Sequence, residues 1–433
     1  MTLHLDLLRR RDPTAMLLRL ARDYPRVAHF RLGTTRVYLL NHPDLITSLL
    51  VTQGRATRKG RMLNKIRIVL GDGLLTSEGA FHARQRRLIQ PALHRDRLGA
   101  YLDLMIRAAR EHGDRWRGGA RVDLAREMSA LTLTVVGRAL FGQHLRRQAG
   151  ELAACLDILL GGSGRHLLPG ADLLLSLPTP GSRRRLRAAD RLDRLVRQLV
   201  DERRRRPGHD LLSVLVGQME PDRARDEAMT LLLAGHETTA TALTWAWWLL
   251  DRHPAVARWW HEEVDAYHLH DPADPDRLPR TRAVLAEAMR LFPPSWLLGR
   301  RLLRPATMDG WRIPAGALCA TSQWAMHRDP RFWAHPLGFR PARWLAGGSF
   351  DESAPGQPRG AYFPFGMGGR ACAGRAFAWV EGTLLLATLG RDWAPRAVPG
   401  RPVGPLPAIT LRPRGGLPVT LHRRAPAPGP AGA

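Results

Sequence analysis

The chain has 433 residues, of which 44% are hydrophobic and 24% are charged, as is ordinary for a folded globular protein. Its formal net charge is +27 at pH 7, but Lys59 and Lys65 are its only lysines, so 64 of its 66 basic residues are arginines. Nucleic-acid-binding proteins mix the two residues and carry a recognisable binding motif, so this composition argues against nucleic acid and favours an acidic protein partner.

The cysteines and the N-terminus indicate the compartment. Cys155, Cys319 and Cys372 are odd in number and far apart, which excludes a disulfide framework and a paired-cysteine metal site. The first residues, MTLHLDLLRRRDPT, lack the long apolar run of a membrane anchor and the apolar region of a signal peptide. We therefore expect a cytoplasmic protein without a membrane anchor.

The first elements in chain order are a hairpin and a helix. Two β-rich runs around a Gly-Thr-Thr turn predict a hairpin over residues 27–41. The stretch 77–90 predicts a helix that Ser77 could cap and that stops before Pro91.

Long helices follow. Residues 183–206 form an amphipathic segment with Ser182 as a candidate cap. The stretch 221–254 has no internal proline and predicts a helix of about 30 residues, roughly 45 Å long, which would cross a large domain. Residues 281–292 predict a further helix that two prolines terminate.

Beyond residue 300, prolines and glycines interrupt short apolar runs, which predicts small sheets and irregular backbone. The last residues, 423–433, end in the low-complexity sequence APAPGPAGA and are expected to be disordered. No Pro/Gly/Ser-rich linker divides the chain, so one large domain or two packed lobes are both possible.

The loop FGMGGRACAG contains Cys372 among glycines. Glycines let backbone N–H groups turn toward a sulfur and stabilise its thiolate, while Arg370 can grip a carboxylate and Phe365 can shield the sulfur from water. The alternative is a small buried cysteine with glycines that serve only as turn residues. The following stretch, RAFAWVEGTLLLATL, predicts a helix whose N-terminal dipole would favour the thiolate.

The order Phe365-x-x-Gly368-x-Arg370-x-Cys372-x-Gly374 resembles the haem-binding signature of the cytochrome P450 family. The resemblance implies haem b with Cys372 as the iron ligand. It also implies a mainly α fold with small β-sheets (α+β), in which a long central helix lies over the haem. The haem domain would span residues 25–422, after an N-terminal segment of residues 1–24.

A second segment, AGHETT, lies within the predicted long helix and resembles the oxygen-activation motif of the family. The resemblance implies that Ala234 and Gly235 leave space for dioxygen and that Glu237 and Thr238 deliver protons. A threonine hydroxyl that bonds back to the helix can loosen the local ladder and admit water. Taken alone, the hexapeptide also fits an ordinary amphipathic helix with a polar stripe.

Glu287 and Arg290 lie three residues apart on a predicted helix, so they share a face. Alone they fit a surface ion pair of little value. The family resemblance implies a structural triad completed by Arg343, although Ala342 replaces a glutamate often found in the family.

Further cations resemble those that the family uses to bind haem propionates. His82 and Arg86 lie one helical turn apart, and Arg300 is a third candidate, with Arg301 beside it as an alternative. Each of these residues also fits a solvated surface.

The resemblance implies a substrate pocket lined by two apolar segments, which favours a hydrophobic small molecule. Its predicted residues are Ser295, Trp296, Leu297, Leu298, Leu406 and Ile409.

The implied activity is a monooxygenase reaction with O2, either hydroxylation or epoxidation, in bacterial secondary metabolism. Candidate substrates are terpenes, polyketides and fatty acyl compounds. The chain is too short for a fused reductase, so electrons would come from an acidic ferredoxin and an NAD(P)H-dependent ferredoxin reductase, and the protein would be a monomer. The alternatives are a peroxide-driven or rearranging haem-thiolate enzyme and a non-enzymatic haem sensor.

Overall fold

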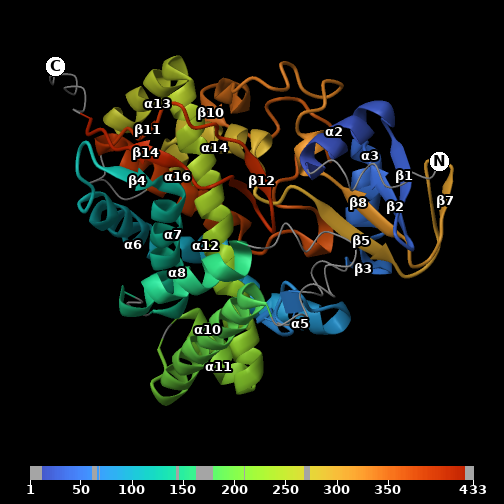
Figure 1. The fold of residues 1–433 in the computed structure, drawn as a ribbon, viewed down its shortest axis with the longest axis horizontal. Coiled ribbons are helices and arrows are strands. Elements are labelled where there is room, and N and C mark those ends of the chain that lie inside the picture. The colour runs from blue at the N-terminus through green and yellow to red at the C-terminus, as the bar shows by residue number, and fades with distance from the viewer. Residues whose placement is uncertain are drawn as a thin grey trace.

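Figure 1 presents the computed structural model, which describes residues 12–60, 66–67, 69–142, 146–161, 179–208, 210–267 and 274–424. Residues 1–11 of the predicted N-terminal segment and 425–433 of the predicted tail lie outside the described residues. The described α-helices are α2 Pro13–Asp23, α3 Pro43–Thr47, α5 Gly79–Ile89, α6 Arg95–Gly113, α7 Leu124–Phe141, α8 Arg146–Gly161, α10 Pro180–Arg205, α11 Leu211–Gln218, α12 Pro221–Arg252, α13 Pro254–Ala266, α14 Pro279–Leu291, α15 Gln323–Met326 and α16 Arg375–Asp392.

The strands form small sheets. A five-stranded sheet has the order β1-β2-β8-β5-β3, in which β2 and β8 pair in parallel and the other neighbours are antiparallel. A three-stranded sheet has the order β11-β14-β4, and the described residues also form three two-stranded pairs. The strands are β1 Val27–Leu32, β2 Thr35–Leu40, β3 Thr57–Lys59, β4 Arg121–Asp123, β5 Leu298–Leu302, β6 Ala306–Met308, β7 Trp311–Ile313, β8 Leu318–Thr321, β9 Leu345–Ala346, β10 Ser349–Phe350, β11 Arg396–Ala397, β12 Pro405–Pro407, β13 Leu411–Pro413 and β14 Pro418–Thr420. The predicted mainly α fold with small sheets is confirmed.

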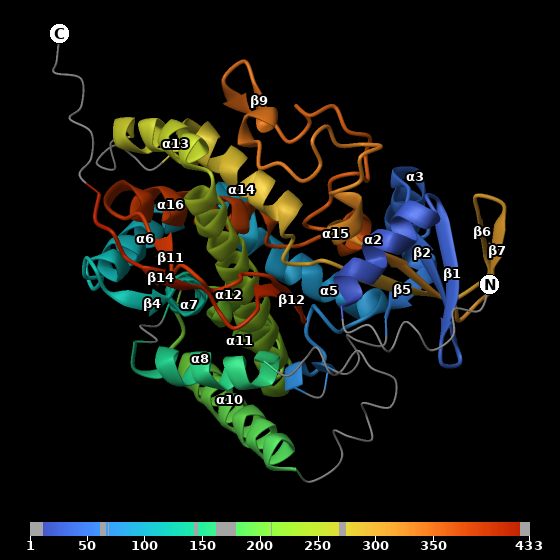
Figure 2. The ribbon, with the colours of Figure 1, turned by 45° about the horizontal axis from the view of Figure 1, so that its top comes forward.

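Helix α12 runs through the middle of the helical part, while the five-stranded sheet lies to one side (Figures 1 and 2). Its 32 residues begin at Pro221, in the first turn where proline costs no hydrogen bond, and end just before Pro254. Most of its side chains are buried, and it packs closely against α7. A Cβ on Gly235 would lie 3.1 Å from Val136 Cγ2, so a glycine at this position allows α7 its close approach. The predicted long central helix is confirmed.

The other predicted elements are also present, with different caps. The hairpin forms as β1 and β2, and the helices predicted over 77–90, 183–206 and 281–292 correspond to α5, α10 and α14. The prediction that Ser77 caps α5 is wrong, because Glu78 occupies the cap position and makes no side-chain cap bond. The prediction that Ser182 caps α10 is also wrong. Pro180 fixes the first helical residue and Thr179 Oγ1 accepts the Ser182 N–H at 3.1 Å, so the helix starts earlier.

Apolar clusters join the helical part and the sheet. The largest packs side chains of α6, α7, α10, α12, α14 and α16 together. A smaller cluster joins Leu17 and Leu20 of α2 to Phe30 of β1. None of the helices described here is both long and apolar enough to cross a membrane.

Candidate functional site

The cysteine loop runs along the short helical segment η1, Ser48–Thr52, before it enters α16. Gly368 has φ +69°, and a Cβ at this position would overlap the carbonyl oxygen of Leu50. Inside the loop, the Cys372 N–H donates to Phe365 O at 2.8 Å. Glycine is therefore required at 368 for both the backbone conformation and the close approach to η1.

Cys372 is an exposed residue that lies three residues before α16 begins. Desolvation raises the pKa of its thiol, while the Gly374 N–H, Arg86 and Arg375 act in the opposite direction. A soft ligand with a backbone N–H and two cations beside it fits coordination of a metal ion that stabilises the thiolate.

Five basic side chains converge beside this loop, and we call them the cationic cluster. They come from β3, α5, β5 and the loop itself: Lys59, His82, Arg86, Arg300 and Arg370. Burial, together with the other four cations, lowers the pKa of His82 to about 3. Burial, assisted by Arg370, also lowers the pKa of Arg300 and brings that of Lys59 to about 7.

The cross-strand register adds to this concentration of positive charge. Lys59 of β3 lies directly opposite Arg300 of β5, where two like charges destabilise a sheet unless an anion lies between them. Glu78 pairs with Arg370, and Glu227 faces Lys59, but cations still outnumber these carboxylates. The cluster therefore fits a cofactor that carries carboxylates, as haem does.

The predicted propionate-binding residues occupy different positions in this cluster. His82 and Arg300 are buried, whereas the alternative Arg301 is exposed on the other face of β5. Arg86 Nη1 donates to the carbonyl oxygens of Gly369 (3.3 Å) and Ala371 (2.7 Å), so it also supports the cysteine loop.

In the middle of α12, Ala234 is exposed and Thr238, one turn later, is partly exposed, whereas most of their neighbours are buried. The Thr238 hydroxyl donates to Ala234 O at 2.8 Å. A threonine hydroxyl in the segment AGHETT is expected to be able to bond back to the helix in this way.

Glu237 is buried and faces the β12–β13 hairpin. It forms an ion pair with Arg412, and its Oε1 accepts the Thr410 hydroxyl at 2.6 Å. Both partners hold the carboxylate at the hairpin, whereas the Thr238 hydroxyl is bonded to its own helix. Proton delivery by Glu237 would therefore require exchange of these partners.

Glu287 and Arg290 are fully buried, and Arg343 joins them. Arg290 Nε and Nη2 donate to the two carboxylate oxygens at 2.9 and 2.8 Å, and Arg343 Nε donates to Oε1 at 3.2 Å. The Arg340 N–H and Trp344 Nε1 satisfy the same carboxylate at 3.0 and 2.9 Å. This network connects α14 to the irregular segment that leads to the cysteine loop.

The predicted pocket residues divide into two groups. Trp296 is buried with Phe30 and Trp324, and its Nε1 donates to Ala408 O at 2.9 Å, so its side chain lies in the core and joins the two predicted segments. The others are partly exposed: Ser295, Leu297, Leu298, Leu406 and Ile409.

Several residues of this region carry no local motif. Lys59 and Arg412 come from the short strands β3 and β13, and Glu78 directly precedes α5. Only the rarity of lysine in this sequence could have singled out Lys59. Glu381 is fully buried on α16, where desolvation raises its pKa to about 8 and the Thr239 hydroxyl opposes the rise. The sequence could have indicated that Glu381 is buried, because it is the acidic residue within the apolar run WVEGTLLLATL.

Comparisons with known proteins agree with this geometry. The family model "Cytochrome P450" matches residues 1–403. Cyclooctatin synthase of Streptomyces melanosporofaciens is 38% identical over 400 residues, which cover 89% of this chain and 86% of the relative. Pentalenene oxygenase of Streptomyces avermitilis is 31% identical over 410 residues, with 92% and 90% covered. Among solved structures, CYP175A1 from Thermus thermophilus has a TM-score of 0.79 at 30% identity and covers 98% of this chain and 99% of its own.

Proposed function

Since the chain belongs to the cytochrome P450 family and is a haem-dependent monooxygenase, we propose that it oxidises a cyclic terpene in bacterial secondary metabolism. The relatives named cyclooctatin synthase, cyclooctat-9-en-7-ol 5-monooxygenase and pentalenene oxygenase carry this proposal. The partly exposed apolar residues Leu297, Leu298, Leu406 and Ile409 support a hydrophobic substrate. The product would be an alcohol or an epoxide.

The roles of the residues follow from the chemistry at each position. Haem b would supply the oxygen-activating chemistry. Cys372 would bind its iron, and the loop residues Phe365, Gly368 and Gly374 would shape and shield that ligand. The cationic cluster would hold the propionates.

On α12, the small residues Ala234 and Gly235 would leave space for dioxygen. The Thr238 hydroxyl would hold a water molecule and pass protons inward from Glu237. Arg412 and Thr410 bind the Glu237 carboxylate at the β12–β13 hairpin, so proton delivery would require these contacts to exchange.

The test of the function uses the purified holoenzyme with pentalenene and cyclooctat-9-en-7-ol as probes. We expect a strongly red-shifted Soret band after reduction and carbon monoxide addition, and a product heavier by one oxygen atom when an acidic ferredoxin, its reductase and NAD(P)H are supplied. Turnover with hydrogen peroxide but not with ferredoxin would favour the peroxide-driven alternative. The red-shifted band without turnover of any lipophilic probe would favour a sensor.

Replacing Thr238 with alanine should separate electron use from product formation. The variant keeps its haem and its carbon monoxide spectrum, but product formed per NAD(P)H falls about tenfold or more, because general acid catalysis at such a position contributes about 10²–10⁴-fold. The measurement is the ratio of product and hydrogen peroxide to NAD(P)H consumed. Thr244→Ala is the matched control, since Thr244 makes the same bond back to its helix, to Ala240 O at 2.7 Å. Unchanged coupling in Thr238→Ala would remove Thr238 from the relay.

The redox partner would be an acidic ferredoxin that docks on arginines near the cysteine loop. Arg87 of α5, Arg97 of α6 and Arg375 of α16 are exposed on helices that adjoin this loop. The protein would act as a cytoplasmic monomer that meets this partner transiently.

Reversing one of these charges should slow electron transfer. We expect Arg87→Glu to lower the second-order rate of reduction by ferredoxin about tenfold at low salt, with the difference fading as ionic strength rises. Arg312→Glu is the control, because β7 lies at the edge of the molecule away from α16 (Figure 1). Equal effects of the two variants, or rates independent of salt, would contradict this docking surface.

A further inference from the structure

The loop from Gly71 to Ser77 lies directly on the first half of α12. Gly71 has φ +62°, and a Cβ at this position would overlap the Asp226 carboxylate. A Cβ on Gly73 would overlap the Thr230 hydroxyl. The two glycines therefore bring the loop backbone into contact with two consecutive turns of the helix.

Two neighbouring acids of α12 hold alternate amides of this loop. Asp226 Oδ2 accepts the Asp72 N–H at 2.7 Å, and Glu227 Oε2 accepts the Leu74 N–H at 2.9 Å. Lys59 Nζ donates to the carbonyl oxygen of Leu74 at 2.9 Å, so both backbone polar groups of Leu74 are bound by side chains. The loop is thus fixed to α12 by side chains rather than by a backbone ladder.

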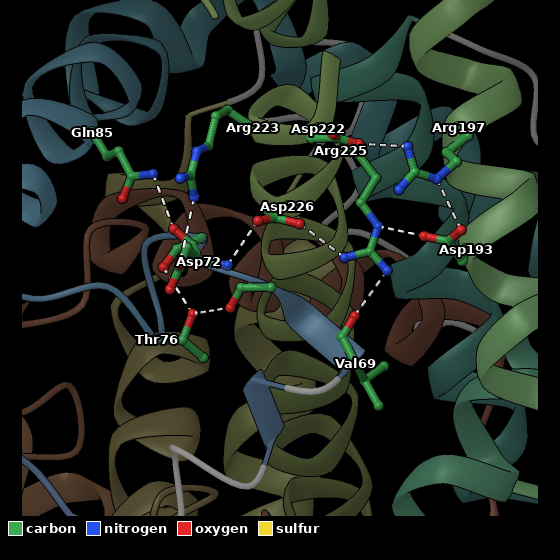
Figure 3. Close-up of polar contacts among 12 residues, drawn as sticks. Val69, Asp72, Thr76, Gln85, Asp193, Arg197, Asp222, Arg223, Arg225 and Asp226 are labelled. Atoms are coloured by element: carbon green, nitrogen blue, oxygen red, sulfur yellow. Dashed lines mark hydrogen bonds and ion pairs between the residues drawn. The ribbon is translucent and has the colours of Figure 1, made fainter. Parts of the chain in front are cut away.

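Asp226 belongs to a network that balances its charge (Figure 3). Arg225 donates to Asp226 at 2.9 Å, to Asp193 of α10 at 2.6 Å and to Val69 O at 3.0 Å. In Figure 3, Asp226 lies between the loop residue Asp72 and Arg225. Through Arg225, this arrangement connects Asp226 and the loop to α10.

Glu227 lies in a different environment. It is fully buried, and its Oε1 has no hydrogen-bond partner among the described residues. The charged groups that face it are Asp226 from its own helix and Lys59 from β3. Burial raises its pKa to about 7, Asp226 adds to the rise, and the Leu74 N–H and Lys59 oppose it.

Other buried polar atoms around the loop also lack partners within the described part of the chain. They are Ser77 Oγ, Gln85 Oε1 and Thr230 Oγ1. Buried polar atoms of this kind are usually satisfied by water, which is also a vehicle for protons. A cavity of about 240 Å³ lined by Asp72, Ser77 and Arg223, among others, reaches the same loop and offers a route for exchange with solvent.

We propose that Glu227 is a positioning residue that couples the Gly71–Ser77 loop to proton binding. While the Glu227 carboxyl group is protonated, the loop stays closed on α12. When the loop opens, water reaches the carboxyl group and its proton passes to solvent. The resulting carboxylate favours the open loop. The physical reason is that a charged carboxylate is strongly destabilised when it is buried away from water and is well solvated when it is exposed. Because Leu74 and Leu75 pack against the main apolar cluster, opening the loop removes part of an apolar wall.

The sign of the pH dependence follows from the two states. In the closed state the pKa is about 7, whereas an exposed glutamic acid has its ordinary value of 4.5. Between these values the closed loop binds a proton that the open loop does not, so a rise in pH favours opening. The population of the open loop should increase by up to about tenfold per pH unit in this window and level off above it.

Amide hydrogen exchange of the holoenzyme between pH 5 and 8 tests this proposal. After correction for intrinsic exchange rates, we expect the Leu74 amide of the wild type to exchange up to about 100-fold faster at pH 7.5 than at pH 5. Glu227→Gln, which stays neutral, should remove the pH dependence and keep the slow exchange seen at low pH.

Two controls separate this effect from a general loosening of the structure. Asp226→Asn should speed exchange of the Asp72 amide at every pH. The Leu74 amide should keep its pH dependence, with the upper limit of the window at lower pH, because Asp226 adds to the rise of the Glu227 pKa. Thr244→Ala, which removes a hydroxyl about four to five turns beyond Glu227 on α12, should behave as the wild type. A pH-independent Leu74 amide in the wild type overturns the proposal even if Glu227→Gln does not fold, and so does a Glu227→Gln variant with the wild-type slope.

Discussion

The Cys372→Ser variant is expected to lose the strongly red-shifted Soret band of the reduced carbon monoxide complex and to fall to background monooxygenase turnover. A serine hydroxyl is a harder and far less electron-donating ligand than a thiolate, and the thiolate is what favours cleavage of the O–O bond in this family. The loop itself should persist, because the Cys372 N–H to Phe365 O bond and the close approach of Gly368 to Leu50 involve only backbone.

The measurements are the absorption spectrum and the haem content of the purified variant. Cys155→Ser is the control, since Cys155 is a buried residue of α8 outside the cysteine loop. A variant with the wild-type carbon monoxide spectrum would show that Cys372 does not bind the iron. Loss of the band in both variants would indicate a general failure to fold.

The second large effect concerns the buried network around Glu287. Glu287→Ala should lower the free energy of unfolding by about 3–5 kcal/mol, because it leaves the buried Arg290 guanidinium without its carboxylate. It also removes the acceptor of Arg343 and of Trp344 Nε1, which hold the segment leading to the cysteine loop. We therefore expect haem to be lost at a lower urea concentration in this variant.

Urea unfolding followed by circular dichroism measures the free energy of unfolding, and haem absorbance in the same experiment measures the urea concentration at which haem is lost. The control is Glu262→Ala, which breaks an exposed pair with Arg280 (2.7 Å) and should cost about 0–1 kcal/mol. If both variants lost the same stability, the buried network would be no more important than a surface ion pair.

The sequence predicts those parts of the fold that depend on neighbouring residues. The apolar, proline-free composition of α12 and the Pro-Pro stop after α14 act within a few turns, so both helices form where they are expected. The N-cap residues were harder to predict, because a competing position lies close by in each case. Glu78 follows Ser77 at the start of α5, and Thr179 lies three residues before Ser182 at the start of α10. For α10, Pro180 at the first helical position sets the start of the helix and makes Thr179 the N-cap.

The candidate site could be predicted only where a motif is continuous. The cysteine loop and the segment AGHETT of α12 can be identified from the sequence, whereas the residues that contact them come from distant elements. Arg412 reaches Glu237 from the β12–β13 hairpin, and Lys59 meets Arg300 only because β3 and β5 pair. Such contacts depend on tertiary packing and leave no periodic pattern in the chain.

The parallel pairing of β2 with β8 has a consequence for synthesis of the chain. Val37 pairs with Leu318, so the β1–β2 hairpin leaves the ribosome with one edge unpaired until the long stretch of chain between these two residues has been made. At about 5–20 residues per second this interval lasts tens of seconds. During that time the edge could pair with another nascent chain, and β8 must arrive from far along the sequence, which makes closure of the five-stranded sheet a late and slow event in folding.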